Sequence, residues 1–186
     1  MSKEHFENIE DEILVAKIVE TNNQHLFGIL YDRYADKIYN KCLGFVEDSN
    51  EAQDMTHDIF IKIYVKMKTF KGESKFSTWV YSFTYNFCIN HVQRTYNKEK
   101  KKLSEENISD EIIEDIDDKE IFELKIEKLN QSIKLLNVED KSILLMKYQD
   151  DFSIKDIANS LEIGESATKM RLNRAKSRLI NLYNSL

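Results

Sequence analysis

Residues 152–179 constrain the fold of this chain more than any other stretch, because they carry the pattern of two short helices joined by a tight turn. Ser153 can cap the first helix through its hydroxyl, and Asp156, three residues later, can accept a hydrogen bond from the backbone of the cap. Gly164 marks the start of the second helix. Residues at spacings of four, three and four then place one apolar side of the second helix against the first. The stretch predicts a helix-turn-helix, with Thr168, Leu172, Ala175 and Leu179 on the packed side.

The opposite side of the second helix carries hydrogen-bond donors and acceptors that can reach base edges in a DNA major groove. Residues 165–186 hold five Lys or Arg and one acid, Glu165, in a chain whose net charge is −6. An amphipathic helix with a solvated basic face is the alternative, but capping, turn and charge together favour DNA. Arg171, Lys176 and Arg178 are suited to phosphates. The candidate DNA-contacting residues are Ser166, Lys169, Met170, Arg171, Asn173, Arg174, Ser177 and Arg178.

The scarcity of helix breakers extends the helical prediction to the whole chain. Its 186 residues include no proline and four glycines, and hardly any run alternates between apolar and polar residues. We therefore expect an all-α protein with a sizeable core. No apolar run is long enough for a membrane span, and the acidic, polar start is unlike a signal peptide, so we expect a cytoplasmic location without membrane insertion. Cys42 and Cys88 lie in apolar helical patterns, which favours buried free thiols.

Apolar spacing predicts four helices in the first half of the chain, at about 8–21, 24–46, 49–70 and 75–97. The expected core-facing residues are Ile9, Ile13, Ala16 and Val19 in the first, Phe27, Leu30, Tyr31, Tyr34, Ile38, Cys42 and Phe45 in the second, Ala52, Met55, Ile59, Ile63 and Met67 in the third, and Phe76, Trp79, Val80, Phe83 and Phe87 in the fourth.

Capping patterns support these boundaries. Asp48 with Glu51 can open the third helix, and Ser74 is expected to cap the fourth. In the second half of the chain, apolar spacing predicts a helix that begins near residue 126, and Asn137 with Asp140 can cap the next one. The apolar positions of that earlier helix are Ile126, Leu129, Ile133 and Leu136.

Six aromatic residues crowd into residues 76–87 of the fourth helix, more than one face can hold. Tyr81 and Tyr85 fall outside the apolar stripe and are expected at its side or exposed. Exposed aromatic rings beside lysines can stack unpaired bases, and each stack is worth about 1–3 kcal/mol. Core packing is the alternative interpretation, since aromatic stripes are usually buried.

The sequence order of these motifs resembles the promoter-melting region of bacterial sigma factors of the extracytoplasmic-function (ECF) type. The matching stretches are EAQDMTHDIF at residues 51–60 and FKGESKFSTWV at residues 70–80, followed by Asn86 and Arg94. Asp54 and Phe60 match the family pattern. The chain departs from it where Gln53, His57 and Asn90 replace the usual Glu, Gln and Asp.

The helix-turn-helix is similar to the second domain of the same family. Its typical ending, Thr-Val-Lys-Ser-Arg-Leu-x-Arg-Ala-Arg, is matched here by Lys169, Arg171, Leu172, Arg174 and Ala175. Ala167 and Thr168 occupy the Thr and Val places, and Lys176 occupies that of the last Arg. The resemblance covers about residues 24–98 and 126–180.

This resemblance implies a two-domain transcription initiation factor that is not an enzyme and needs no cofactor. Residues 1–98 would form a helical bundle that docks on core RNA polymerase and recognises and melts the minus-ten element. Residues 99–125 would be a flexible linker, and residues 126–186 a helix-turn-helix domain for the minus-thirty-five element. Core RNA polymerase and promoter DNA are the implied partners, and an anti-sigma factor is a further candidate.

The resemblance also assigns residues to each contact. Docking on the polymerase would use the third helix, and capture of a melted minus-ten base would use the loop at 70–76 with the helix that follows. The implied polymerase-binding residues are Asp54, His57, Asp58 and Phe60. The implied minus-ten residues are Lys71, Gly72, Glu73, Ser74, Lys75, Phe76, Trp79, Tyr81, Tyr85, Asn86 and Arg94.

Residues 99–125 hold 11 acidic and 5 basic side chains without a packed apolar period, which is typical of a flexible linker. We expect these acids to suppress non-specific DNA binding by the free factor. Two other functions remain open at this point. One is a stand-alone helix-turn-helix repressor. The other is a helical hydrolase that uses a metal held by the acidic run or by Cys88 and His91.

Overall fold

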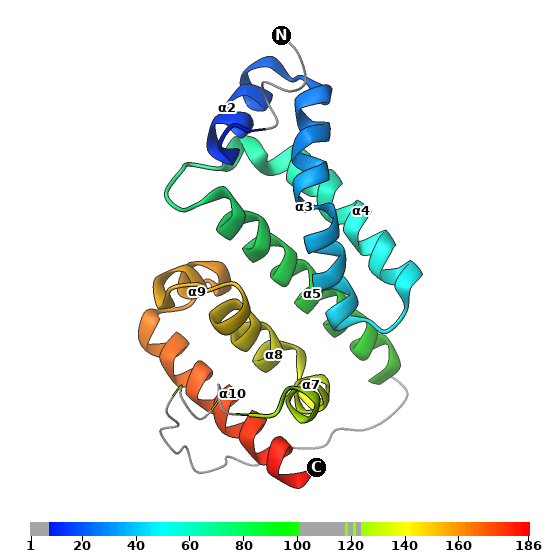
Figure 1. The fold of residues 1–186 in the computed structure, drawn as a ribbon, viewed down its shortest axis with the longest axis vertical. Coiled ribbons are helices and arrows are strands. Elements are labelled where there is room, and N and C mark those ends of the chain that lie inside the picture. The colour runs from blue at the N-terminus through cyan, green and yellow to red at the C-terminus, as the bar shows by residue number, and fades with distance from the viewer. Residues whose placement is uncertain (1–7, 101–117, 119–120, 122–123) are drawn as a thin grey trace. The chain divides into compact units, whose positions relative to one another are not determined.

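The structure, a computed structural model, describes residues 8–100, 118, 121 and 124–186, with the side chains of 97–100 left undescribed. The chain divides into two compact units, Met1–Cys88 and Ile89–Leu186. Both units are built from helices (Figure 1), and no strand occurs within the ranges just given. The all-α prediction is confirmed.

The N-terminal unit contains α2 (Asp11–Thr21), α3 (Gln24–Phe45), α4 (Ser49–Lys66), the 3₁₀ turn η1 (Met67–Thr69) and the first half of α5 (Phe76–Lys100). The side chain of Asn23 caps α3 by accepting from the N–H groups of His25 and Leu26. Asp48 caps α4 in the same way, as predicted. Helix α3 packs against both α2 and α4, which forms the bundle around one core.

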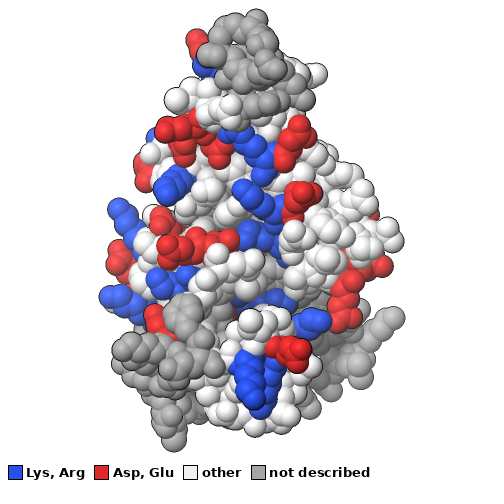
Figure 2. All heavy atoms as spheres, in the orientation of Figure 1, with Lys and Arg blue, Asp and Glu red and all other residues white. Residues whose placement is uncertain are grey.

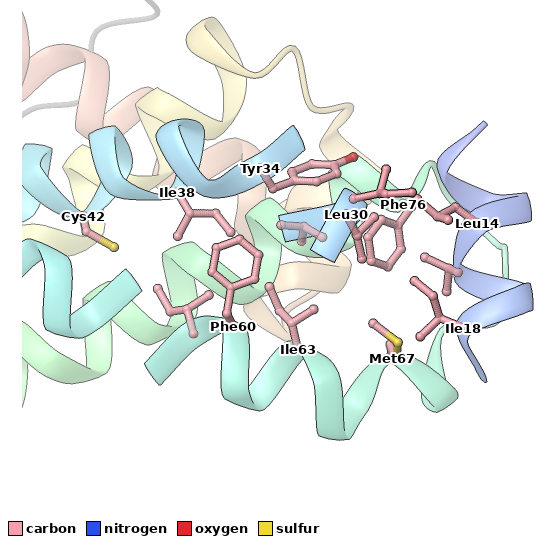
Figure 3. Close-up of a cluster of buried hydrophobic side chains, with 14 of the residues drawn as sticks. Leu14, Ile18, Leu30, Tyr34, Ile38, Cys42, Phe60, Ile63, Met67 and Phe76 are labelled. Atoms are coloured by element: carbon pink, nitrogen blue, oxygen red, sulfur yellow. The ribbon is translucent and has the colours of Figure 1, made fainter. Parts of the chain in front are cut away.

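The core of this unit is apolar and draws side chains from all four helices (Figure 3). The predicted inward stripe of α4 is confirmed, since all five of its members are buried. Fully burying one Leu, Ile or Phe side chain stabilises a fold by about 1.5–3 kcal/mol, so this cluster supplies the main driving force for the bundle. The stripe comprises Ala52, Met55, Ile59 and Ile63 of α4, continued by Met67 of η1.

Helix α2 buries a different face from the one predicted. Ile13 and Val19 are exposed, while Leu14, Val15 and Ile18 are buried. Two apolar stripes at helical spacing compete in this 11-residue helix. The stripe that meets the bundle wins, since its members gain contacts with the core and the other stripe faces solvent.

Helix α5 is buried on two sides, which overturns the expected exposure of Tyr85. The ring of Tyr85 is fully buried and packs edge-on against Phe45 of α3, with centroids 6.1 Å apart. Cys88 lies on the same side and its thiol hydrogen-bonds with that of Cys42. Both cysteines are free and buried, as predicted. This hydrogen bond, together with burial, raises the pKa of Cys88 above that of an ordinary thiol.

The C-terminal unit contains α7 (Ile126–Leu135), α8 (Val138–Leu144), the π-helical turn η2 (Leu145–Gln149), α9 (Ile154–Leu161) and α10 (Glu165–Ser185). Helix α10 packs against α7, α8 and α9 and so organises the unit. The predicted helix-turn-helix is therefore present as α9 and α10, and its packed side is buried as expected. The buried residues of that side are Thr168, Leu172, Ala175 and Leu179.

The predicted caps of this unit are confirmed. Asn137 accepts from the N–H of Asp140 at the start of α8. Ser153 and Asp156 form a complete capping box at the start of α9. One apolar position was wrong, because Ile126 at the first turn of α7 is 76% exposed.

Two described residues of the predicted linker, Asp118 and Ile121, belong to the C-terminal unit. Ile121 is buried. Asp118 Oδ1 accepts from the hydroxyl of Tyr148 at 2.6 Å and from Lys176 Nζ at 3.0 Å. Lys176 is only 7% exposed, so its expected contact with a phosphate is wrong and its charge is paired with Asp118 instead. Most of the linker, including the acids expected to suppress DNA binding, lies outside the described residues.

We predict that the Asp118→Asn substitution weakens α10 in a pH-dependent way. The hydrogen bond from Tyr148, aided by Lys176, holds the pKa of Asp118 below its ordinary value. The ionised carboxylate therefore stabilises the unit at neutral pH, and this contribution is lost as the pH falls through the lowered pKa of the folded state. The carboxylate is half-exposed, so we expect a deficit of about 0.5 kcal/mol in the free energy of unfolding at pH 7, which shrinks as the pH falls and vanishes below the lowered pKa of the folded state.

Hydrogen exchange of α10 amides across this pH range measures the effect. Asp151→Asn is the matched control, because it removes an exposed carboxylate of the same unit at a left-handed position that Asn tolerates. If the difference in stability between Asp118→Asn and wild type stays constant from pH 7 to pH 3, the contribution of Asp118 is not electrostatic.

Candidate nucleic-acid interface

The N-terminal three turns of α10 present a polar and basic surface. Ser166, Lys169, Met170, Arg171 and Arg174 are exposed on it, and Asn173 is half-buried. The buried side of the same helix is fixed by α7, α8 and α9, so the exposed side is held rigidly outward. An exposed helix face of this composition can enter a major groove, with arginine reading guanine and lysine contacting phosphates.

Two predicted contact residues near the middle of α10 have other partners. Ser177 is buried and donates to the backbone carbonyl of Asn173 at 3.1 Å, so its side chain faces the protein rather than DNA. Arg178 Nη1 pairs with the buried carboxylate of Asp140 at 2.5 Å. The arginine thereby joins α10 to α8. The prediction that Ser177 contacts DNA is wrong in this structure for a simple reason: its hydroxyl lies against its own helix backbone.

The loop at residues 70–76 is closed by aromatic packing. The ring of Phe70 packs edge-on against Phe76 and Trp79, with centroids 5.2 and 6.0 Å apart. Gly72 adopts φ +73°, a left-handed conformation that strains any residue with a Cβ. The loop's polar side chains point outward, since Lys71, Glu73 and Lys75 are exposed and Ser74 is half-buried. Phe76 is fully buried, which contradicts its prediction as a DNA-contacting side chain and makes it an anchor of the loop.

The rest of the predicted minus-ten surface lies along α5. Trp79, Tyr81 and Asn86 are half-buried, and Arg94 is exposed. Tyr85 cannot stack a base in this structure because its ring is enclosed by the bundle.

Lysines of the neighbouring helices lie over the aromatic rings of α5, an arrangement that the sequence analysis missed. Lys41 Nζ is 4.4 Å from the centroid of Tyr81, and Lys62 Nζ is 4.3 Å from that of Phe87. Lys66 lies over Phe83 at 5.5 Å. Such cation–π contacts place an ammonium over a ring face, and Lys62 and Lys66 are exposed, so their charge can also meet a single strand. Only the tertiary structure could reveal them, since the partners come from different helices.

Helix α4 carries an exposed strip of mixed character. Asp54, His57 and Asp58 are exposed, as their predicted role in docking requires. Ile61 and Val65 continue the strip at helical spacing and are 64% and 60% exposed. The sequence analysis missed these two residues, although apolar positions outside the core stripe were the available signal.

Phe60 belongs to the opposite side of α4 and is buried. Its ring packs against Tyr31 and Phe27 of α3, with centroids 4.3 and 6.3 Å apart. This burial contradicts the prediction that its side chain contacts the polymerase.

Other kinds of site find no support in the described part of the chain. No cluster of three or more His, Cys, Asp or Glu side chains there could hold a metal ion. No helix among the described residues is long and apolar enough to cross a membrane. Acidic and basic side chains are interspersed over much of the face seen in Figure 2, so neither sign of charge covers that face as a whole.

Two family models match the chain. Sigma-70 region 2 matches residues 30–97, and Sigma-70 region 4 matches residues 126–179. The chain is 28% identical over 172 residues to the ECF RNA polymerase sigma factor SigW of Bacillus subtilis, covering 88% of this chain and 91% of SigW. It is 29% identical over 175 residues to the RNA polymerase sigma-H factor of Pseudomonas aeruginosa, covering 90% of each.

Two solved structures share the fold. CnrH, in a complex with the cytosolic domain of CnrY, matches with a TM-score of 0.63 at 17% identity, covering 94% of this chain and 97% of CnrH. The sigma factor RpoE of Bartonella quintana, in a complex with the anti-sigma factor NepR, matches with a TM-score of 0.60 at 17% identity. That match covers 85% of this chain and 96% of RpoE.

We predict that substitutions on α10 separate into two groups. Arg174→Ala should weaken binding to an upstream duplex and relax base preference by about 1–3 kcal/mol at one position, as expected for a bidentate contact with guanine. Lys169→Ala should weaken binding to all sequences. It should also make the slope of log affinity against log salt concentration shallower by about 1. Ser177→Ala should leave DNA binding unchanged, because the side chain is buried.

Fluorescence anisotropy with promoter duplexes over a salt titration measures all three variants. An unchanged ranking of duplex sequences in Arg174→Ala would reduce Arg174 to a phosphate contact. A loss of DNA binding in Ser177→Ala, with the fold intact, would contradict the orientation of α10 described above.

Proposed function

The chain belongs to the extracytoplasmic-function type of RNA polymerase sigma factors, and from that premise we propose how its surfaces share the work of promoter-directed initiation. A protein of this family is a transcription initiation factor that binds core RNA polymerase and directs it to promoters. It is not an enzyme, since catalysis belongs to the polymerase. Its partners place its work in the cytoplasm.

The exposed face of α10 reads the upstream minus-thirty-five element as duplex DNA. Support comes from its exposed Lys169, Arg171 and Arg174, which are presented by a helix whose other side is buried. Rigid presentation favours base readout, because little conformational entropy is lost on docking. This face is the single observation that best supports specific promoter recognition.

The loop at residues 70–76 and the exposed edges of α5 bind the melted minus-ten strand. The exposed tip of the loop offers Lys71 and Lys75 to phosphates, and half-buried Trp79 and Tyr81 offer ring edges to a base. Extracting a base costs a few kcal/mol of unstacking, least where pairs are weak. Contacts of the extracted base with the preformed loop and the aromatic edges can offset this unstacking free energy.

The strip on α4 docks on the core polymerase. Asp54 and Asp58 supply negative charge, and Ile61 and Val65 supply apolar area that is exposed in the free chain. Apolar side chains surrounded by charge are typical of a protein–protein contact whose centre is dry and whose rim is polar. The similar structure of RpoE in a complex with the anti-sigma factor NepR supports an anti-sigma factor as a further partner of this chain.

The domain assignment of residues 1–98, 99–125 and 126–186 is part of the same proposal. The two family models match segments that fall inside the outer two ranges. A stand-alone repressor would need no docking surface for polymerase, so the strip on α4 favours the initiation factor.

We predict that Asp54→Lys combined with Asp58→Lys abolishes assembly with core RNA polymerase. The reversal places two positive charges one turn apart in the N-terminal half of the strip and leaves the core-facing side of α4 untouched. Ile61→Ser with Val65→Ser should weaken assembly at least tenfold, because two exposed apolar contacts are lost. Co-purification with core enzyme and fluorescence titration measure the affinity, with circular dichroism to verify the fold.

The matched control reverses Asp32 and Asp36 to Lys on α3, where two exposed acids also lie one turn apart. This control should assemble normally. Normal assembly by the α4 double reversal, or equal loss in both reversals, would show that α4 is not the dock.

A further inference from the structure

The first turn of α5 is capped by a residue from a different helix. The backbone N–H of Phe76 donates to Glu12 Oε1 of α2 at 2.7 Å, across 64 positions of sequence. Helix α5 begins at Phe76, so Lys75 occupies the N-cap position, one residue later than the Ser74 expected from sequence. A lysine side chain has no hydrogen-bond acceptor and cannot cap a helix. The carboxylate of Glu12 therefore supplies the acceptor and also the negative charge that a helix N-terminus favours.

Glu12 acts at the exit of the loop, and packing holds the entrance. The N–H of Phe70 donates to the carbonyl of Met67 at 3.0 Å, which continues η1 into the loop. The ring of Phe70 then closes onto Phe76 and Trp79. With both ends fixed, the exposed tip between Lys71 and Lys75 is presented in one conformation. Without the cap, the first turn of α5 could fray and the tip would move.

Helix α2 is anchored to α3 and to the core, and it therefore forms a fixed platform that holds the Glu12 side chain in place. Asp11 accepts from Arg33 Nη1 at 2.5 Å and also from the hydroxyl of Tyr34, both on α3. Leu14 is fully buried beside Phe76 in the core cluster (Figure 3). The Sigma-70 region 2 match begins at residue 30, so this platform lies outside the matched segment.

We propose that Glu12 is a positioning residue for promoter opening, because it fixes the loop that captures the minus-ten base. This inference rests on the proposed role of the loop. A preordered loop loses less conformational entropy when the single strand binds. The free-energy barrier to promoter opening is therefore lower, and opening is faster. Glu12 itself touches no DNA in this scheme and has no part in docking on the polymerase or in binding the upstream duplex.

Three substitutions of Glu12 separate the effect of its side-chain length on the hydrogen bond to Phe76 from the effect of its negative charge. Glu12→Gln keeps a side-chain oxygen that can accept from Phe76, so opening should stay within about twofold of wild type. Glu12→Asp keeps the charge but shortens the side chain by one methylene, and Glu12→Ala removes the acceptor. Both should slow opening about three- to tenfold, the size expected from losing a helix cap. Glu20→Ala removes an exposed carboxylate from the last turns of the same helix and is the matched control.

The measurement uses full-length factor, reconstituted with core enzyme, on a promoter selected with the wild-type holoenzyme. Fluorescence of 2-aminopurine in the minus-ten element reports the rate of opening, at a temperature where circular dichroism shows every variant folded. Affinities for core enzyme and for upstream duplex should be unchanged. A parallel loop variant, Lys71→Ala with Lys75→Ala, tests the role of the loop itself.

The outcomes distinguish the inference from its premise. If the loop variant slows opening and Glu12→Ala does not, the positioning role is overturned and the proposed function of the loop stands. If the loop variant opens the promoter like wild type, the proposed function of the loop fails and the inference fails with it. If Glu12→Ala loses affinity for core enzyme to the same degree, its effect is a general loss of structure and the positioning role is overturned.

Discussion

Burial of α5 on two sides is the constraint on which the N-terminal unit depends. One side of the helix meets α3, where Tyr85 packs against Phe45, and another meets α4, where Lys62 lies over Phe87. A helix held in this way cannot rotate without breaking both contacts. The loop that leads into it is therefore fixed at its exit, and the aromatic side chains that remain half-exposed are presented at a defined edge of the bundle.

The same helices that build the core carry the proposed contact surfaces, because one face of a helix can be buried while the opposite face is exposed. On α4, buried Ile59 and Ile63 lie opposite exposed Asp58 and Ile61. On α10 the buried side similarly fixes the direction of the basic side. Rigid presentation is the shared physical principle: groups held by a packed core lose little entropy when they bind a partner.

Local charge, rather than net charge, accounts for the proposed DNA binding of an acidic protein. The chain carries −6 overall, yet lysines lie over the rings of α5, and Lys169, Arg171 and Arg174 are exposed on α10. At physiological salt the screening length is about 8 Å, so a phosphate responds mainly to the charges beside it. Acidic side chains on α4 and elsewhere can then serve other contacts without abolishing DNA affinity.

The sequence by itself determined the all-α class, the caps of α4, α8 and α9, the helix-turn-helix and the family, because these depend on local spacing and on motifs contiguous in the chain. It could not determine which of two apolar stripes α2 buries, that Tyr85 is enclosed, or that Lys176 pairs with Asp118. Nor could it supply the cap of α5, which comes from Glu12 across 64 positions. Periodicity identifies the faces that a helix offers, whereas only the tertiary structure decides which neighbour covers each face and which distant side chain satisfies its backbone.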